Sequence, residues 1–247
     1  MHPIDINCDL GEGFPNDDKL MGFISSANIA CGFHAGNFSL MSRLVSMAIQ
    51  NDVAIGAHPG FPDTINFGRL EMTFSNQAIY DMMLYQIGAL HAIARAQGAR
   101  LHHVKPHGAL YNMAAVSIEM SNAIVKAISD FDPQLVLYGL ANSELIKAAK
   151  TIGLPFKQEV FADRTFQASG TLTPRNQPNA LIVNSDLAIA QVLLMVREKT
   201  VIATTGERIP IQADTVCIHG DGVHVLEFAK ALNSRIKMEG IQIISLA

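Results

Sequence analysis

The chain of 247 residues lacks long apolar runs, and only 16% of its residues are charged. No stretch approaches about 18 uninterrupted apolar residues, the length typical of a transmembrane helix, so no membrane segment is expected. The first residues show no basic region followed by an apolar core, so we expect no signal peptide. A net charge of −4 lacks the basic excess that nucleic-acid-binding proteins use, which argues against nucleic acid as a partner.

Cysteine is scarce and does not occur in pairs. Cys8, Cys31 and Cys217 are far apart and include no C-x-x-C motif. An odd number of widely spaced cysteines fits a reducing compartment better than a disulfide framework, so we expect the protein in the cytoplasm. Each cysteine lies in an apolar run, where a free thiol packs like a small hydrophobic side chain.

Several common catalytic motifs are missing. There is no GxxxxGK[ST] phosphate loop and no GxGxxG after a strand, so neither familiar nucleotide-binding motif is present. The GxSxG motif of serine hydrolases is absent as well.

Four histidines occur in one repeated local setting. Each follows a short apolar run and has a glycine within the next two residues: His34, His58, His107 and His219. Such a run reads as a buried strand leaving its sheet. Polar residues at the carboxyl ends of successive strands form the active sites of α/β barrels, so the pattern predicts an enzyme. The remaining histidines with a clear setting, in a helix or at the amino end of a strand, are interpreted as structural: His91, His102 and His103.

Strand and helix patterns alternate along the whole chain. We expect strands near 4–8, 27–32, 53–57, 101–105, 135–139, 157–161, 215–218 and 241–246. We expect helices over 39–51, 75–98, 117–130, 142–152, 185–198 and 224–236. This alternation predicts an α/β fold with parallel strands, in the form of a single irregular (β/α) barrel of seven or eight strands over residues 1–247. A small β-hairpin insertion is expected near 200–213, with Gly206 at its turn.

Three strand ends carry polar residues two positions apart. They are Asn7 with Asp9, Lys105 with His107, and His219 with Asp221. Side chains two apart point to the same side of a strand, and Pro106 keeps the backbone between Lys105 and His107 extended. Because unpaired buried polar groups cost about 1–3 kcal/mol each, these pairs indicate function rather than stability.

Further charged and polar side chains accompany these pairs: Glu12, Asp63, Arg69, Glu159, Asp163 and Arg164. Together they predict a pocket that transfers protons and binds an anion, with Arg164 or Lys105 facing a carboxylate or an oxyanion. The histidines with Asp9 and Asp221 are also suitable zinc ligands, but no HExxH motif is present. Spacing alone does not establish a metal site, so none is assigned.

The ordered motifs DINCDLGEGF, SANIACGFHAG, IGAHPGFPD, VKPHGALYN, EVFADR and CIHGD run nearly end to end. Through them the chain resembles the LamB/YcsF family, whose members act as the A subunit of bacterial ATP-dependent 5-oxoprolinase. The resemblance implies a barrel of the glycoside hydrolase and deacetylase type. It also implies cleavage of 5-oxo-L-proline to L-glutamate with ATP as cosubstrate of a complex containing 5-oxoprolinase subunits B and C.

The motifs that carry the resemblance contain all candidate site residues. We assign catalytic roles to Asp9, His34, His58, Lys105, His107, His219 and Asp221. We assign substrate binding to Asn7, Glu12, Asp63, Glu159, Asp163 and Arg164. The sequence departs from the family pattern at Pro15, Asn37, Leu70, Ser169 and Val223, and the resulting loss of two acids and an arginine is compatible with an altered substrate preference.

Three functional hypotheses follow. In the first, Arg164 or Lys105 binds the carboxylate, one histidine oriented by Asp9 or Asp221 delivers water to the ring carbonyl, and another protonates the departing nitrogen. In the second, the chain is a stand-alone metal-dependent hydrolase or deacetylase. In the third, it is a non-catalytic lactam-binding regulatory subunit. The resemblance favours the first.

Overall fold

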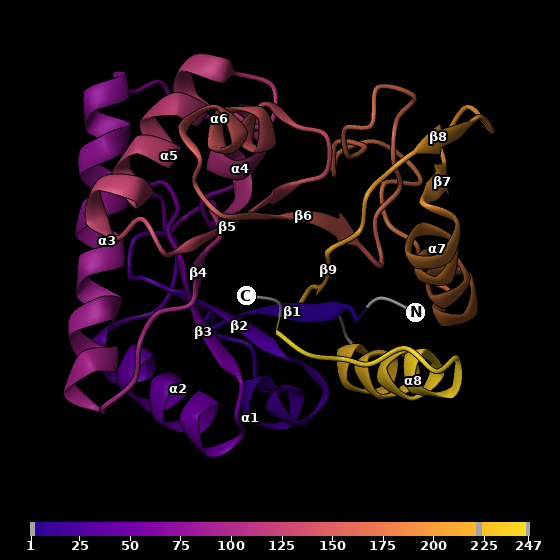
Figure 1. Cartoon of the computed structure of the whole chain (residues 1–247), viewed down its shortest axis with the longest axis horizontal. Coiled ribbons are helices and arrows are strands. Elements are labelled where there is room, and N and C mark those ends of the chain that lie inside the picture. The colour runs from indigo at the N-terminus through magenta and orange to yellow at the C-terminus, as the bar shows by residue number, and fades with distance from the viewer. Residues whose placement is uncertain (1–2, 221–223, 246–247) are drawn as a thin grey trace.

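The computed structural model describes residues 3–220 and 224–245, and in this part of the chain seven parallel strands form a closed barrel. The strands are β1 (Asp5–Leu10), β2 (Ser26–Ala30), β3 (Ala54–His58), β4 (His103–Val104), β5 (Val136–Leu140), β6 (Phe156–Phe161) and β9 (Thr215–Ile218). Each strand pairs with the next in this order, and β9 closes the barrel against β1 (Figure 1). The structure therefore confirms the α/β barrel.

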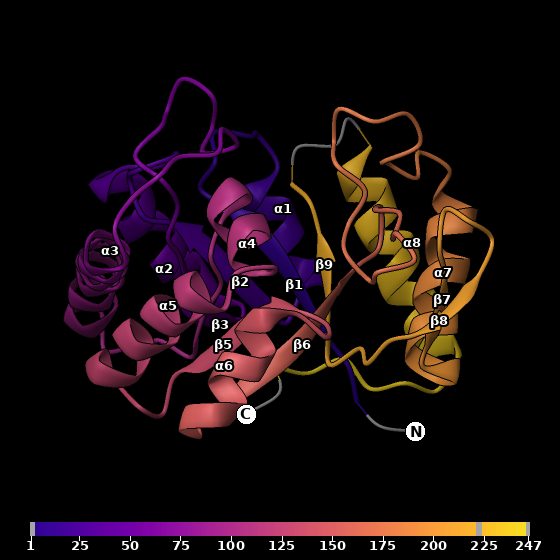
Figure 2. The same cartoon turned by 90° about the horizontal axis from the view of Figure 1, so that it is seen from above.

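Helices surround the barrel (Figures 1 and 2). They are α1 (Asp17–Leu20), α2 (Phe38–Gln50), α3 (Asn76–Ala96), α4 (Gly108–Ala114), α5 (Ile118–Phe131), α6 (Glu144–Ile152), α7 (Ser185–Glu198) and α8 (Val225–Met238), with a 3₁₀ turn η1 at Met21–Phe23. None of the helices in the described ranges is long and apolar enough to cross a bilayer.

Helix α3 follows directly from its sequence. The Ser75 hydroxyl accepts a hydrogen bond from the Ala78 amide at 3.2 Å and so caps the first turn. One apolar face is buried against the barrel: Ile79, Met83, Ile87 and Leu90. Gly98, with φ +77°, takes the left-handed conformation that ends the helical path.

Strands β7 (Thr200–Ile202) and β8 (Arg208–Pro210) form an antiparallel hairpin outside the barrel. Gly206, at φ +83°, lies in its turn. The hairpin packs beside α7, at the right of Figure 1.

The strand expected over 241–246 is not formed in the described part of this segment. Residue 246 lies outside the described residues, and 241–245 make only a single parallel bridge, between Ile4 and Ile243. Because β9 pairs directly with β1, the barrel closes without an eighth strand. The seven-residue helix α4 was not expected, because it starts immediately at the strand-end motif that ends in His107.

Strand β1 has two different faces. Ile6, Cys8 and Leu10 join the hydrophobic core beneath the helices, so Asp5 and Asn7, on the alternate face, lie inside the barrel. Inside, Asp5 accepts hydrogen bonds from the hydroxyls of Ser25 and Ser26 at 2.6 and 2.7 Å. The barrel interior is therefore polar and hydrogen-bonded below the strand ends.

Candidate active site

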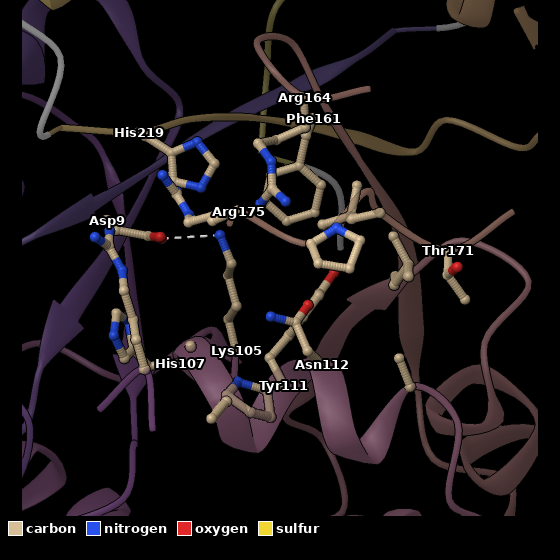
Figure 3. Close-up of a pocket in the computed structure, with 18 of the residues that line it drawn as sticks. Asp9, Lys105, His107, Tyr111, Asn112, Phe161, Arg164, Thr171, Arg175 and His219 are labelled. Carbon is tan, nitrogen blue, oxygen red and sulfur yellow. Dashed lines mark hydrogen bonds and ion pairs between the residues drawn. The ribbon is translucent and has the colours of Figure 1, made fainter. Parts of the chain in front are cut away.

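A cavity of about 440 Å³ opens at the carboxyl ends of the strands. Its lining combines acids, bases and cations, among them Asp9, Glu12, His58, Lys105, His107, Arg164 and His219. Figure 3 shows Lys105 reaching Asp9 in the middle of this pocket, with His107 and His219 on the same side and Arg164 beside Phe161. The volume suits a small polar metabolite.

Lys105 is the buried cation at the base of the pocket. Its Nζ lies 2.8 Å from Asp9 Oδ1 and 2.8 Å from Glu159 Oε1. Burial lowers the pKa of the ammonium group, but the charges of Asp9 and Glu159 outweigh burial and hold this pKa well above its usual value. Lys105 is therefore a fixed positive charge.

A network of amides holds Asp9 and Lys105 in place. Asn28 Nδ2 donates to Asp9 Oδ1 at 2.7 Å and to Asn7 Oδ1 at 2.8 Å. The Asn7 Oδ1 also accepts from Lys105 Nζ at 3.2 Å. His103 Nε2 donates to Asn28 Oδ1 at 2.7 Å, because this oxygen can only accept. Asn7 and His103 are fully buried, so they position the site from below.

A second cluster consists of Glu12, His34, His58 and His107, which we call the histidine–glutamate cluster. Glu12 Oε1 lies 3.2 Å from His34 Nε2, 3.6 Å from His58 Nε2 and 3.1 Å from His107 Nδ1. The His34 and His107 rings stack at 3.7 Å between centroids, with 3° between their planes. One ligand atom from each residue lies within 4.8 Å of the others, so the cluster can hold a metal ion.

Burial and the contacts within this cluster shift the pKa values of its residues in opposite directions. Burial lowers the pKa of His34 to about 3. Burial raises the pKa of the Glu12 carboxyl, but its contacts with the His107 and His34 rings outweigh burial and hold this pKa well below its usual value. Glu12 is therefore ionised at neutral pH.

Asp9, Cys217 and His219 form another group whose ligand atoms lie within 4.8 Å of one another. The Cys217 thiol is fully buried and accepts a hydrogen bond from Lys105 Nζ at 3.1 Å. Burial raises the pKa of this thiol well above its usual value, so a thiolate is disfavoured there.

The segment 162–184 forms the opposite wall of the pocket and contributes Arg164 and Arg175. Arg164 Nε and Nη2 donate to the backbone carbonyls of Ala180 and Thr173, which orients the guanidinium group. Burial, followed by repulsion from Arg175, lowers the pKa of Arg164 to about 10, so this side chain stays charged at neutral pH. Two guanidinium groups on one wall make that side of the pocket suitable for an anion.

The chain is similar to known proteins over nearly its whole length. The model of the LamB/YcsF family matches residues 4–247. The chain belongs to this family. A relative from Bacillus subtilis (strain 168), named as the A subunit of 5-oxoprolinase, is 51% identical over 252 residues, covering 100% of this chain and 98% of the relative.

Two solved structures are also similar to this chain. A lactam utilization protein from Thermus thermophilus matches with a TM-score of 0.92 and 39% identity, over 99% of this chain and 100% of that one. A family 4 carbohydrate esterase from Streptomyces lividans has a TM-score of 0.53 at 10% identity, over 100% of this chain and 93% of the esterase. This second likeness shows the fold alone.

The structure brings most of the sequence-predicted residues to one place. Those that line the cavity are Asp9, Glu12, His58, Lys105, His107, Arg164 and His219, with His34 stacked behind His107. Asn7 and Glu159 lie below the cavity, where both contact Lys105. Asp163 pairs with His219 Nδ1 at 2.8 Å. Asp221 lies outside the described residues.

Asp63 does not line the pocket. Its Oδ1 accepts hydrogen bonds from the backbone and side-chain amides of Asn66, both at 3.0 Å, so it shapes the loop after β3. That loop presents the Phe67 carbonyl to His107 Nε2 at 2.9 Å. In this structure the contribution of Asp63 to the site is therefore indirect.

Sequence reasoning missed several residues of the site. Tyr111 donates to Glu159 Oε2 at 2.6 Å, and it lies one helical turn after His107. Recognising α4 would have indicated Tyr111, because residues four apart share a helix face. Asn28 was predictable, because it lies two positions after Ser26 in an apolar strand and side chains two apart point to the same face. Arg175 lies in an irregular segment and carried none.

Four departures from the family pattern lie away from the pocket lining: Pro15, Asn37, Leu70 and Ser169. Asn37 accepts a hydrogen bond from the Leu40 amide at 3.0 Å and caps α2, a role that aspartate and asparagine fill equally well. Leu70 is 55% exposed. Ser169 lies in segment 162–184, where its hydroxyl is 2.8 Å from that of Thr171. Val223 lies outside the described residues.

Proposed function

We propose that this chain is the A subunit of an ATP-dependent 5-oxoprolinase, acting in the cytoplasm with subunits B and C to convert 5-oxo-L-proline into L-glutamate. The main support is one small pocket that combines acid–base residues with three arginines, Arg69, Arg164 and Arg175, in a chain 51% identical to a relative named for that enzyme. ATP is the cosubstrate of the complex, because opening an unstrained five-membered lactam needs a driving force.

The opposite wall of the pocket would bind the substrate. A carboxylate placed between Arg164 and Arg175 would be held by charge-assisted hydrogen bonds. Lys105 then faces the reacting end of the lactam, since it lines the base of the same cavity. Its fixed positive charge would stabilise negative charge developing on the carbonyl oxygen.

His219 is the best-placed proton carrier outside the histidine–glutamate cluster. Its Nδ1 lies 2.8 Å from Asp163 Oδ1, and this carboxylate only accepts, so Nδ1 carries the proton. The lone pair on Nε2 is then available to take a proton from water as the water oxygen bonds to the lactam carbon. Breakage of the ring C–N bond releases the nitrogen, which takes up a proton to give the amino group of glutamate.

The test is glutamate release from 5-oxoproline and ATP, measured for this chain alone and together with subunits B and C. We expect turnover only in the full mixture. The variant His219→Asn should lower kcat by about 100-fold or more, the contribution typical of a general base. His91→Gln is the matched control, because His91 packs on Phe131 outside the barrel.

Normal turnover by His219→Asn would remove His219 from the mechanism. Hydrolysis by this chain alone, without ATP, would instead identify a stand-alone hydrolase. No turnover in a mixture with competent partners would contradict the proposed function.

A further inference from the structure

We propose that the histidine–glutamate cluster is a binding site for one divalent transition-metal ion, of which zinc is the best match. The ligands would be Glu12 Oε1, His58 Nε2 and His107 Nδ1, from three of the four residues that group beside the pocket. The His34 ring stacks on His107 and contacts Glu12 Oε1, so it supports the site rather than binding the ion. This inference rests on ring geometry and is independent of the lactam reaction.

Backbone carbonyls determine which ring nitrogens carry hydrogen. His58 Nδ1 lies 2.7 Å from the Lys105 carbonyl oxygen, and His107 Nε2 lies 2.9 Å from that of Phe67. A carbonyl oxygen can only accept, so both of these nitrogens donate. In neutral rings the other two nitrogens, His58 Nε2 and His107 Nδ1, must therefore present lone pairs.

These two lone pairs point at each other. His58 Nε2 and His107 Nδ1 are 3.0 Å apart, and the ionised Glu12 carboxylate faces both. Acceptors facing acceptors in a buried site repel each other and leave each lone pair unsatisfied. A cation bound by both nitrogens and the Glu12 oxygen, off the line that joins the nitrogens, turns this repulsion into three attractive contacts.

The spacing of the atoms also fits a metal ion. Zinc binds histidine nitrogen at about 2.0–2.1 Å, which places neighbouring ligands of a tetrahedron about 3.3 Å apart. Glu12 Oε1 lies 3.6 Å from His58 Nε2 and 3.1 Å from His107 Nδ1, and these two nitrogens are 3.0 Å apart. Imidazoles with one carboxylate favour zinc and similar ions over calcium or magnesium.

The supporting residues hold the cluster rigidly. The carbonyls behind His58 and His107 are the outer partners that fix the ring orientation of metal-bound histidines. A Cβ at Gly60 would lie 2.6 Å from His34 Nδ1, and one at Gly68 would lie 2.8 Å from His34 Cβ. The backbone thus closes tightly on the His34 ring and keeps Nε2 directed at Glu12.

A metal ion bound there would polarise a water molecule or a carbonyl at the edge of the pocket, since Glu12, His58 and His107 line the cavity.

The test is direct binding of Zn²⁺ to the full chain after removal of metals with a chelator. Isothermal titration calorimetry should give one equivalent per chain. Co²⁺ in place of zinc should give the visible absorption of a low-coordinate site with nitrogen ligands. Glu12→Gln and His107→Gln should each weaken binding by more than about 100-fold, since changes to outer partners alone cost about 10- to 100-fold.

Three controls make the result decisive. Circular dichroism of the metal-free variants shows that each is folded. His91→Gln should bind Zn²⁺ like the unmodified chain, which excludes loss through a remote histidine. His219→Asn should also retain binding; if it alone abolishes binding, the ion belongs to the group with Asp9 and Cys217, and the proposal is wrong.

Absence of stoichiometric binding by the unmodified chain would also overturn the proposal. A proton shared between His58 and His107 would then account for their 3.0 Å contact. Nitrogen NMR of the metal-free chain would identify it, by showing one of the two rings protonated on both nitrogens.

Discussion

Lys105 contributes to the site through both its side chain and its backbone. The ammonium group balances Asp9 and Glu159, and the carbonyl oxygen of the same residue fixes the His58 ring. Lys105 is 2% exposed, so its two carboxylate partners are largely shielded from water. Its removal leaves those acids without a compensating charge.

We predict that Lys105→Met destabilises the fold by about 3–5 kcal/mol, the cost of leaving buried partners of an ion pair uncompensated. Urea unfolding at neutral pH measures this loss. Lys126→Met is the matched control, because Lys126 is exposed and pairs with Asp130 on the surface of α5; it should leave the unfolding midpoint unchanged. Equal midpoints for Lys105→Met and the unmodified chain would contradict this account of the ion pair.

Single residues differ in how far the sequence could predict them. Lys105 and His107 were predictable, because Pro106 fixes an extended backbone and residues two apart share a side. The facing lone pairs of His58 and His107 were not, since they depend on carbonyls that only the folded chain brings to the rings.

Among the elements, the segment 162–184 and strand β9 together form one side of the pocket. Asp163 leaves β6 and meets His219 at the end of β9. Burial raises the pKa of the Asp163 carboxyl, but the ion pair and hydrogen bond with His219 outweigh it, and the net shift is downward from 3.8.

This shift predicts how stability depends on pH. A carboxyl whose pKa is lower in the folded state stabilises the fold above its unfolded pKa, here 3.8, and loses this contribution as the pH falls through its folded pKa. Asp163→Asn should therefore lose less stability than the unmodified chain between about pH 5 and pH 3. Urea midpoints across that range measure the difference.

The control for this prediction is Asp81→Asn, at an exposed position on α3. Its pH dependence should follow that of the unmodified chain. If the urea midpoint of Asp163→Asn changes with pH as steeply as that of the unmodified chain, the Asp163 carboxyl does not couple to His219 in the folded state.

Periodic elements were predictable from the sequence, whereas short ones were not. The apolar face of α3 and its serine cap determine that helix locally. Helix α4 is only seven residues long, and the apolar segment 241–246 reads as a strand in isolation. Whether such a segment joins the barrel depends on closure between β9 and β1, which no local pattern encodes.

At the scale of the whole molecule, the closed barrel draws on both ends of the described chain. Strand β1 lies between β2 and β9, and Ile4, fully buried, donates its amide to the Gln242 carbonyl at 2.9 Å. Opening any one strand therefore exposes the interior of all the others. We propose that the barrel and its hairpin insertion form one domain.

One domain predicts a single cooperative unfolding transition. The chain has no tryptophan and four tyrosines, so far-ultraviolet and near-ultraviolet circular dichroism are the suitable probes. Both should give the same urea midpoint. Ile4→Ala should shift the two midpoints together and lower the free energy of unfolding by about 2–5 kcal/mol. Separate transitions in the two signals would show two domains.

Segment 162–184 and the histidine–glutamate cluster come from separate parts of the sequence, so mutations can change one without the other. All four cluster residues come from the first 107 positions, whereas Arg164 and Arg175 come from a later stretch of coding sequence. Mutations in the later stretch, where Ser169 already departs from the family pattern, can change the wall of the pocket while the four cluster residues stay unchanged. Selection can therefore act on the wall of the pocket and on the cluster separately.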